Sequence, residues 1–487
     1  MIIDSSGMKK IEASGTLSSY ELMELAGRSV AEEIRKETSA SDVILFLAGK
    51  GNNGGDAYVA CRELKDRKCF LIPVDGKPAA AEAVQAASLL NRKLVRSAAY
   101  FDKALKQADV VVDAVYGFSY RGELKPQIRQ IFDKVSCSKA RVFSIDINSG
   151  CEADTGRCDS HALHSEITYV LDCYKPFHML KKDHHMFERT VRIDLHLPHE
   201  IQTMWPEMDE DEFFRNFPKK ADNAYKGTFG KTLLCGGCFG MAGALSLNIT
   251  GAKTVGAPYI NAALPDSIYP VVASHHITPV FHPFGYDNAE DVLRSLIKDA
   301  DAAAFGSGAV NMYKSRECMD LLLQECRCPV ILDAAALRLL KHNTYIFRFV
   351  RTPVILTPHI GEFADLINRP TAFILSDRIT CAKEFAKENN VYLVLKGPHT
   401  IAVSPDGQCY INQTGNQALA QAGSGDLLTG IMAGLLTMTK DVYKAVCMAV
   451  WLHGYLADIG TQYHSIQNFP IEKYPEIMDR LLMKHGF

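Results

Sequence analysis

Short apolar runs alternate with amphipathic stretches along the whole chain, and most of these runs end in small or polar residues. Residues 43–48 read Val-Ile-Leu-Phe-Leu-Ala, which is typical of a strand buried on both faces of a parallel sheet. Residues 49–56 form a glycine-rich loop, and residues 57–64 have a helical pattern. The repeated order of strand, loop and helix predicts an α/β fold with two doubly wound domains and mostly parallel sheets.

The first predicted helix indicates how its domain closes. Ser18 and Glu21 have the spacing of a capping box, so the helix should begin beside them. The apolar side chains that follow recur at helical spacing and should pack on the sheet. They are Leu22, Leu25, Ala26, Val30 and Ile34.

A glycine-rich turn near the C-terminus carries an informative carboxylate. Gly423 and Gly425 precede Asp426, and residues 427–436 continue as an apolar, helical stretch. Free amide groups and the dipole at a helix start attract an anion, so Asp426 would be a base inside a phosphate site. A simpler interpretation is that Asp426 only caps the helix.

Polar strand ends upstream favour the phosphate site. Apolar runs end in small or polar groups at residues 236–237, 306–308, 333, 357–362 and 396–400. Ligands in open α/β sheets gather at the carboxyl ends of strands.

The glycine loop of the first half matches a weak dinucleotide-binding pattern. Gly49, Gly51 and Gly54 have its spacing, and Asp75 lies at about the expected distance beyond. Taken alone, this match would predict an ordinary NAD-binding domain. No Lys-Ser or Lys-Thr closes the loop, so it is not a P-loop.

That pattern leaves several polar groups of the first half unexplained. Asn52, Asn53 and Asp56 lie in the loop itself. Asp113 and Asp146 each end a further apolar run. Parallel strands would bring all three segments to one edge of the sheet.

Length and charge narrow the possibilities. The 487 residues exceed what one hydrophobic core usually serves, which predicts two domains with a boundary near residues 197–222. The acidic run at 209–212 and the basic Lys219 and Lys220 in this interval are read as a solvated face. The net charge of -3 gives no indication of nucleic-acid binding.

The lack of targeting signals and the scattered cysteines predict a cytoplasmic protein. No apolar segment is long enough to span a bilayer, and the first residues lack the basic-then-apolar pattern of a signal peptide. The 14 cysteines are scattered, and Cys235 and Cys238 form the only CxxC. We therefore expect reduced, partly buried thiols rather than a metal site or disulfides, and no membrane partner.

The second half, about residues 220–487, resembles the ribokinase-like superfamily and, within it, the ADP- or ATP-dependent NAD(P)H-hydrate dehydratases. The chain departs from the family pattern at Ala335, where a second Asp after Asp333 is usual, and at Pro258, where glycine is commoner. The motifs that carry the resemblance are KGTFGK at 226–231, TPHIGE at 357–362, LKGPHT at 395–400, Gly415-Asn416 and GSGD at 423–426.

The first half, about residues 1–210, resembles the NAD(P)H-hydrate epimerase domain. The resemblance rests on NNGGD at 52–56, the strand ends at 111–117 and 144–150, LMELAG at 22–27 and Lys175. Asn148 replaces a usual proline, which predicts a less rigid loop before Ser149.

The resemblance implies roles for individual residues of the second half. Asp426 would be the general base of a dehydratase. His359 would line the hydrate pocket, although a packed core histidine is an alternative. The adenine nucleotide would contact Lys396, Gly397, Pro398, His399, Thr400 and Gly425, and the hydrate would also contact Ala244 and Gly308.

Roles follow for the first half in the same way. Asp146 would be catalytic, close to the reacting ring. Asn53, Asp113 and Ser149 would bind potassium, because one carboxylate among neutral oxygens suits a weakly hydrated monovalent ion. The phosphates and ribose of the hydrated cofactor would contact Asn52, Asn53, Gly54, Gly55, Asp56, Gly117, Phe118, Ser119, Tyr120, Arg121, Gly122 and Glu123.

Together the two halves imply a bifunctional enzyme of metabolite repair. Reduced nicotinamide cofactors become hydrated at ring carbon 6, which gives two epimers that cannot carry hydride. Residues 1–210 would interconvert the epimers, and residues 220–487 would dehydrate one of them. The implied partners are NADHX, NADPHX and ADP, with ATP as the alternative nucleotide, Mg²⁺ and K⁺ as ions and a homo-oligomer as the assembly.

Two other functions fit part of the chain. A kinase of a vitamin-like alcohol, of the hydroxymethylpyrimidine or pyridoxal type, would explain the second half and leave the first 210 residues without a role. A non-catalytic nucleotide sensor would bind a nucleotide without needing Asp426.

Overall fold

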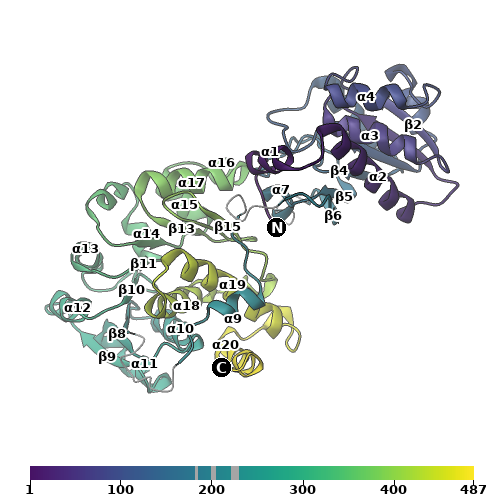
Figure 1. The fold of residues 1–487 in the computed structure, drawn as a ribbon. Coiled ribbons are helices and arrows are strands. Elements are labelled where there is room, and N and C mark those ends of the chain that lie inside the picture. Colours follow the sequence, from purple (N-terminus) through teal and green to yellow (C-terminus); the bar gives the residue numbers. More distant parts are fainter. Residues whose placement is uncertain (181–184, 199–204, 221–229) are drawn as a thin grey trace. The chain divides into compact units, whose positions relative to one another are not determined.

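The computed structural model describes residues 1–180, 185–198, 205–220 and 230–487. These residues form two compact units, Met1–Trp205 and Pro206–Phe487, which we describe separately (Figure 1). The division falls inside the interval 197–222. Most of the KGTFGK motif, residues 226–229, lies outside the described residues.

The N-terminal unit is built on a six-stranded sheet in the order β2-β1-β3-β4-β5-β6. Every neighbouring pair is parallel, as the apolar runs predicted. The chain reverses its direction of winding between β1 and β3, so the ligand crevice is expected at the carboxyl ends of those two strands. The strands are β1 (Val43–Ala48), β2 (Lys68–Pro73), β3 (Val110–Ala114), β4 (Arg141–Ile145), β5 (Ser165–Leu171) and β6 (Phe187–Ile193).

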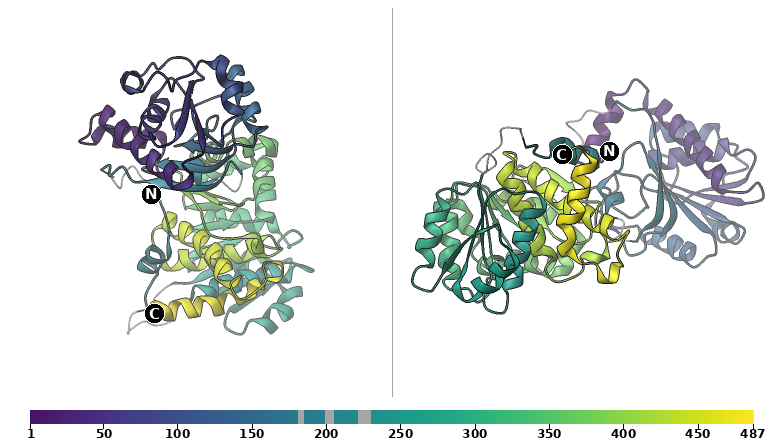
Figure 2. Two further views of the ribbon diagram at one scale, coloured as in Figure 1. Left: turned by 90° about the vertical axis from the view of Figure 1, so that its right-hand side faces the viewer. Right: turned by 90° about the horizontal axis from the view of Figure 1, so that it is seen from below.

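Helices cover both faces of this sheet (Figure 2). Strand β1 shows why, because Ile44 and Phe46 belong to one buried cluster and Leu45 and Leu47 to another. A strand with apolar side chains on both sides needs a covering layer on each. The helices are α1 (Ser5–Ser14), α2 (Ser19–Glu37), α3 (Asn52–Glu63), α4 (Ala81–Leu89), α5 (Phe101–Leu105), α6 (Pro126–Ser136) and α7 (Pro176–Met179).

The predicted start and buried face of α2 are confirmed. The Ser18 hydroxyl accepts a hydrogen bond from the Glu21 backbone N–H at 3.3 Å, and the Glu21 carboxylate accepts one from the Ser18 N–H at 2.8 Å. Ala26, Val30 and Ile34 are buried against the sheet.

The C-terminal unit contains a nine-stranded sheet in the order β15-β14-β13-β12-β11-β10-β7-β8-β9. The seven strands from β7 to β13 pair in parallel, and β14 and β15 add an antiparallel edge. Here the winding reverses between β7 and β10. The strands are β7 (Thr232–Cys235), β8 (Ile260–Pro265), β9 (Val280–Phe284), β10 (Ala302–Phe305), β11 (Val330–Leu332), β12 (Val354–Leu356), β13 (Tyr392–Leu395), β14 (Ile401–Val403) and β15 (Cys409–Ile411).

Helix α18 (Ser424–Met438) packs closely on α10 (Ala242–Thr254) beside this sheet (Figure 1). A Cβ on Gly251 would lie 2.2 Å from the Leu427 carbonyl oxygen, so only glycine permits this approach. The other helices are α9 (Glu210–Asn216), α11 (Tyr269–His275), α12 (Ala289–Ile297), α13 (Ser315–Glu325), α14 (Ala335–Leu339), α15 (Ile360–Ile367), α16 (Thr371–Ser376), α17 (Arg378–Asn389), α19 (Val442–Gly460) and α20 (Tyr474–Lys484).

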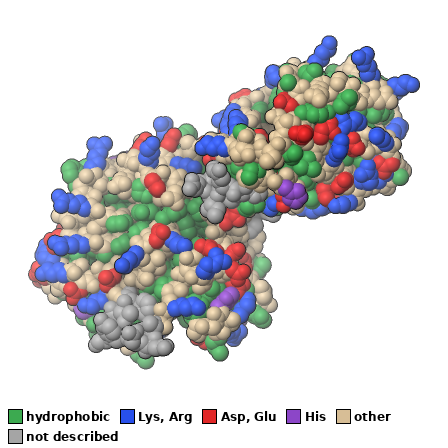
Figure 3. All heavy atoms as spheres, viewed as in Figure 1, with side chains coloured by type: hydrophobic (Ala, Val, Ile, Leu, Met, Phe, Trp, Pro, Cys, Tyr) green, Lys and Arg blue, Asp and Glu red, His purple; other side chains and the backbone are tan. Residues whose placement is uncertain are grey.

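The surface has no single dominant charge on the side that Figure 3 shows. Basic and acidic side chains are interspersed there on each unit. Within the described part of the chain, no helix combines the length and the apolar character that a bilayer crossing requires.

Candidate active sites

A cavity of about 650 Å³ opens at the crevice of the N-terminal unit. It is lined by the loop after β1, the loop after β3, the end of β4 and helix α1. This volume is typical of a small-molecule site. The sequence-predicted residues that line it are Asn52, Asn53, Asp56, Gly117, Phe118, Ser119, Tyr120 and Asp146.

The remaining predicted contacts of this unit lie beside the cavity rather than on its wall. Gly54 and Gly55 are buried inside α3, where a Cβ on Gly54 would lie 2.0 Å from the Gly49 carbonyl oxygen. Arg121, Gly122 and Glu123 continue the loop beyond Tyr120.

Asp146 is the buried carboxylate of the cavity. Its Oδ1 accepts a hydrogen bond from the Lys175 ammonium at 2.6 Å, and its Oδ2 accepts one from the Phe118 N–H at 3.1 Å. Its backbone has a positive φ of 63°, an uncommon conformation for a residue other than glycine. Such strain persists only where the surroundings enforce it, and it clusters at functional sites.

His178 is one of the groups that hold Asp146 in place. The ring nitrogen Nε2 lies 2.8 Å from the Asp146 carbonyl oxygen, and Nδ1 accepts a hydrogen bond from the Lys175 N–H at 2.9 Å. Burial lowers the pKa of His178 to about 3, so the ring is neutral and donates through Nε2.

Asp113 and Ser149, two of the predicted potassium ligands, are in direct contact. The Ser149 hydroxyl donates to Asp113 Oδ1 at 2.6 Å, and the Ser149 N–H donates to Asp113 Oδ2 at 2.8 Å. Burial raises the pKa of Asp113 to about 6, while hydrogen bonds from Ser149 and Val115 lower it. None of the groups that shift this pKa most is a basic side chain.

Asn53, the third predicted ligand, approaches the same turn from α3. Tyr116 N–H donates to the Ser149 hydroxyl at 2.8 Å, and the next residue, Gly117, would carry a Cβ 3.3 Å from the Asn53 side-chain oxygen. The turn after β3 is therefore flanked by Ser149 and Asn53. A buried carboxylate with neutral oxygens around it and no basic partner is a donor set that suits a monovalent cation.

The expectation of a less rigid loop at Asn148 is wrong. Asn148 is fully buried, and its amide donates to the carbonyl oxygens of Leu163 and Met186 at 2.9 and 2.8 Å. Its side-chain oxygen accepts from the Thr168 hydroxyl at 2.7 Å. These hydrogen bonds fix the loop before Ser149 by a different means from the ring of a proline.

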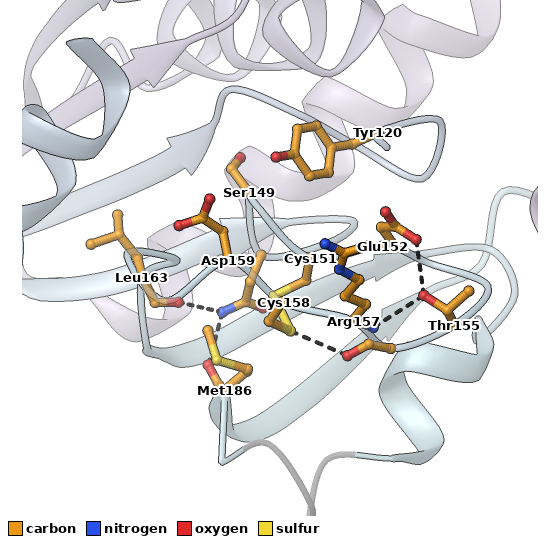
Figure 4. Close-up of a disulfide and its surroundings, with 12 residues drawn as sticks. Tyr120, Ser149, Cys151, Glu152, Thr155, Arg157, Cys158, Asp159, Leu163 and Met186 are labelled. Atoms are coloured by element: carbon orange, nitrogen blue, oxygen red, sulfur yellow. Dashed lines mark hydrogen bonds between the residues drawn. A yellow bond between two sulfur atoms is a disulfide. The ribbon is translucent and has the colours of Figure 1, made fainter. Parts of the chain in front are cut away.

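The expectation that no cysteines are bonded is also wrong. Cys151 and Cys158 form a disulfide across a short loop (Figure 4). The Glu152 N–H donates to the Arg157 carbonyl oxygen at 2.7 Å, which closes that loop and brings the two thiols together. Cys235 and Cys238, by contrast, are buried free thiols, as expected.

In the C-terminal unit the crevice between β7 and β10 gathers predicted hydrate-pocket residues. The Gly237 N–H donates to the Ser307 carbonyl oxygen at 2.8 Å, which ties the two strand ends together. Gly308 has a φ of 66°, and a Cβ there would lie 2.8 Å from the Ala244 Cβ. The structure therefore brings Gly308 and Ala244 into one place.

Asp426 lies in the first turn of α18, and its side chain does not cap the helix. The N-cap residue is Gly423, and no side-chain cap hydrogen bond is present. The Asn248 amide donates to both the Asp426 carbonyl oxygen at 2.7 Å and the Ser307 hydroxyl at 3.1 Å, which joins this turn to the crevice. The interpretation that Asp426 only caps the helix is therefore wrong.

The pKa of Asp426 is raised to about 6. Burial is the largest cause, the Asp333 carboxylate adds to it, and Ser307 and Lys396 oppose it. A general base works best with a pKa near the operating pH.

Asp333, which is buried, and Lys396, which is partly buried, form an ion pair near this carboxylate. Lys396 Nζ donates to Asp333 Oδ1 at 2.8 Å, and the hydroxyls of Thr357 and Thr429 donate to Asp333 at 2.8 and 2.9 Å. A Cβ on Gly425 would lie 3.2 Å from Lys396 Nζ, so the ammonium group lies beside the start of α18.

The predicted nucleotide turn, residues 396–400, is held by Arg378. Its guanidinium donates to the carbonyl oxygens of Pro398 and His399, both at 3.0 Å. The His399 ring is buried, with Nδ1 3.0 Å from the Asn412 carbonyl oxygen. The Thr400 hydroxyl donates to the Gly397 carbonyl oxygen at 3.0 Å.

His359 is not a packed core histidine, because its side chain is 60% exposed. It is the N-cap of α15, where Nδ1 accepts hydrogen bonds from the Gly361 and Glu362 N–H groups at 3.0 and 3.3 Å. Its other ring nitrogen, Nε2, lies 3.5 Å from the Glu362 carboxylate.

Sequence reasoning missed four contributors to these sites. Asp333 follows β11 as Asp146 follows β4, so its position at a strand end was the available signal. Glu12 lies in α1 and lines the N-terminal cavity, but nothing in its sequence context distinguishes it from a surface residue. His178 likewise has no distinctive spacing. Ser307 lies in the polar strand end at 306–308, but the sequence assigned it no role of its own.

Comparisons with known proteins agree with both halves of this description. A family model described as NAD(P)H-hydrate dehydratase matches residues 232–476, and one described as YjeF-related protein N-terminus matches residues 19–177. The bifunctional NAD(P)H-hydrate repair enzyme Nnr of Moorella thermoacetica is 31% identical over 468 residues, covering 91% of this chain and 88% of its own length.

The second half by itself also matches known dehydratases, and one of these matches is a crystal structure. The ADP-dependent (S)-NAD(P)H-hydrate dehydratase of Bacillus subtilis is 34% identical over 276 residues, covering 57% of this chain and 97% of its own. The crystal structure of the ADP/ATP-dependent NAD(P)H-hydrate dehydratase from Bacillus subtilis, co-crystallised with ATP and Mg²⁺, has a TM-score of 0.51 and 32% sequence identity and covers 57% of this chain and 97% of that one. The chain therefore belongs to the family of bifunctional NAD(P)H-hydrate repair enzymes.

Proposed function

We propose that the two units act in sequence on hydrated NADH and NADPH. The N-terminal unit interconverts the R and S hydrates, and the C-terminal unit dehydrates the S hydrate with ADP as phosphoryl donor. The products are NAD(P)H, AMP and phosphate. The observation that carries this proposal is that each unit assembles a buried carboxylate and a lysine at the carboxyl edge of its sheet, within one chain of the repair family.

In the C-terminal unit Asp426 would remove the proton of the hydroxyl on ring carbon 6. The oxygen then takes the phosphoryl group of ADP, and AMP leaves. Elimination of phosphate, with the ring nitrogen supplying the electron pair, restores the ring double bond. The amide groups at the start of α18 and the Lys396 ammonium would hold the charge on the transferring group.

Mg²⁺ would enter with the nucleotide. Across the described residues, no cluster of three or more His, Cys, Asp or Glu could hold a metal ion. Mg²⁺ in phosphoryl-transfer sites commonly takes most of its ligands from phosphate oxygens and water, so the absence of such a cluster is compatible with it. Its chemistry there is to neutralise charge on the phosphates.

In the N-terminal unit Asp146 would contact the hydrated nicotinamide ring of the substrate. A potassium ion would bind next to the turn 115–117. Asn53, Asp113 and Ser149 would hold that ion. Its charge would compensate the buried Asp113 carboxylate and so keep the turn in place beneath the substrate.

The test of this function uses the whole chain with hydrated NADH and either ADP or ATP. We expect the dihydropyridine absorbance to return with ADP, and the epimer mixture to be consumed completely. If no absorbance returns, phosphorylation of a hydroxymethylpyrimidine- or pyridoxal-type alcohol in a parallel assay with ATP would support the kinase instead. Nucleotide binding with no turnover in either assay would support the sensor.

Potassium is tested by exchanging it for lithium at constant ionic strength. We expect epimerisation to slow and the dehydration of purified S hydrate to be unchanged, because the ion belongs to the N-terminal unit alone. An equal rate of epimerisation in both salts would contradict the potassium site.

A further inference from the structure

Glu12 is a carboxylate of the N-terminal cavity that neither the sequence motifs nor the matched segment 19–177 includes. It lies on α1, a helix held firmly at both ends. The Ser5 N–H and hydroxyl donate to Asp154 at 2.7 and 2.8 Å, and Met8 and Ile11 are buried in the core. The position of Glu12 on the cavity wall is therefore fixed by packing.

Helix α1 is also tied to the substrate loop. The Ser5 hydroxyl lies 2.8 Å from the Phe118 carbonyl oxygen, and Phe118 itself lines the cavity and donates its N–H to Asp146. Helix α1 and Asp146 are consequently connected through Ser5 and Phe118, and Glu12 and Asp146 line the same cavity.

The charged groups that face Glu12 come from several elements. Asp146 follows β4, Lys175 follows β5, and Lys9 lies on α1 itself. Asp172 lies at the end of β5, and Asp56 lies on α3. Lys175 forms an ion pair with Asp146 at 2.6 Å, and its charge also lowers the pKa of Glu12.

We propose that Glu12 is the proton donor of epimerisation and protonates the hydroxyl on ring carbon 6 as it leaves. This inference rests on the proposed epimerase function of the N-terminal unit. It assigns a catalytic role to a residue outside the recognised motifs.

The step balances without any further reactant. The C6–O bond breaks, the ring nitrogen supplies the electron pair, and the Glu12 proton leaves with the oxygen as water. The planar ring cation then takes up water on the opposite face, and the surplus proton returns to the Glu12 carboxylate. No net oxidation or reduction occurs, and the product is the other epimer.

The protonation state of Glu12 suits this role. Burial raises its pKa to about 7, the Asp146 charge adds to the increase, and Lys175 and Lys9 oppose it. A group with a pKa near neutrality serves well as acid and base in turn. Burial likewise raises the pKa of Asp56, another carboxyl of the cavity, well above its ordinary value.

The test compares Glu12→Gln with Glu32→Gln, a matched change at an exposed residue of α2 that does not line the cavity. We expect Glu12→Gln to lower the catalysed epimerisation rate by about 10²- to 10⁴-fold, the usual contribution of general acid catalysis, with little change in KM. Glu32→Gln should match the unmodified chain. An undiminished rate in Glu12→Gln would overturn the proposal.

The pH profile provides an independent readout. Because the acid must be protonated, kcat/KM of epimerisation should fall as the pH rises above about 7. Glu12→Asp should keep that limb at reduced rate, and Glu12→Gln should lose it. A limb that persists in Glu12→Gln assigns it to another group and overturns the role of Glu12, whereas an unmodified chain without epimerase activity would remove the proposed function itself.

Discussion

The two units use the same pair of groups in different ways. In the N-terminal unit Asp146, which follows β4, lines the cavity and pairs with Lys175, which follows the neighbouring strand β5. In the C-terminal unit Asp333, at the end of β11, pairs with Lys396 from β13, but its oxygens are taken by two threonines and the lysine. The carboxylate that we propose as the base there is Asp426, which lies in the first turn of a helix.

This difference shows that the position of an aspartate at the end of a strand does not by itself determine its role. A strand-end aspartate that remains in contact with the cavity can act on a ligand. A strand-end aspartate whose oxygens accept hydrogen bonds from buried hydroxyls instead orients a lysine and shifts the pKa of a neighbouring acid.

Replacing Asp426 should have the largest effect. Asp426→Asn keeps the shape of the site and removes the base, so ADP-dependent repair should fall by about 10²- to 10⁴-fold while nucleotide binding persists. Rates of NADH formation and calorimetric binding of ADP measure the two properties. Asp287→Asn, at an exposed position, is the matched control. Repair at the normal rate would show that Asp426 is not the base.

Asp146→Asn should affect only the second part of the reaction. With an epimer mixture, the S hydrate should be repaired at the normal rate, and the R hydrate should then follow at the spontaneous rate of epimerisation. A time course of NADH absorbance would show these two phases. Complete repair in one phase would mean that the N-terminal unit does not supply the second epimer.

Lys396→Met should shift the pH dependence of dehydration. Asp426 must be ionised to act, so the rate should fall as the pH decreases through about 6 in the unmodified chain. Lys396 lowers the pKa of Asp426, and its removal leaves the Asp333 charge unopposed, so the falling limb should move to higher pH. The profile of kcat/KM on S hydrate measures this shift. An unmoved limb would argue against coupling between the pair and the base.

The disulfide should matter least. It closes a loop with a sequence separation of seven, for which chain entropy predicts a contribution of about 2 kcal/mol. Replacing Cys151 and Cys158 by serine should lower the unfolding midpoint of the N-terminal unit and leave both activities unchanged. Cys137→Ser, at an exposed free thiol, is the control. A large loss of epimerisation would instead place this loop in the catalytic machinery.

Local patterns predicted many parts of both units. Apolar runs identified the buried parallel strands, and the Ser18 and Glu21 spacing identified the start of α2. Asp75 fitted the dinucleotide-binding pattern, but its buried carboxylate forms an ion pair with Lys125 at 2.5 Å. At Asn148 the sequence predicted a less rigid loop because the usual proline is absent. Hydrogen bonds from Asn148 to distant residues hold this loop instead.

The sequence alone determined the fold class, the polar strand ends and the carboxylate at the mouth of α18, because strands, turns and helix starts depend on residues close together in the chain. Only the tertiary structure decided which carboxylates line a cavity. In the folded chain Glu12 lines the cavity, Asp333 accepts a hydrogen bond from a lysine, and Cys151 is bonded to Cys158. Packing and hydrogen bonding between distant residues produce these contacts. Burial and the distances between charges set the pKa of each acid, and those quantities exist only once the chain has folded.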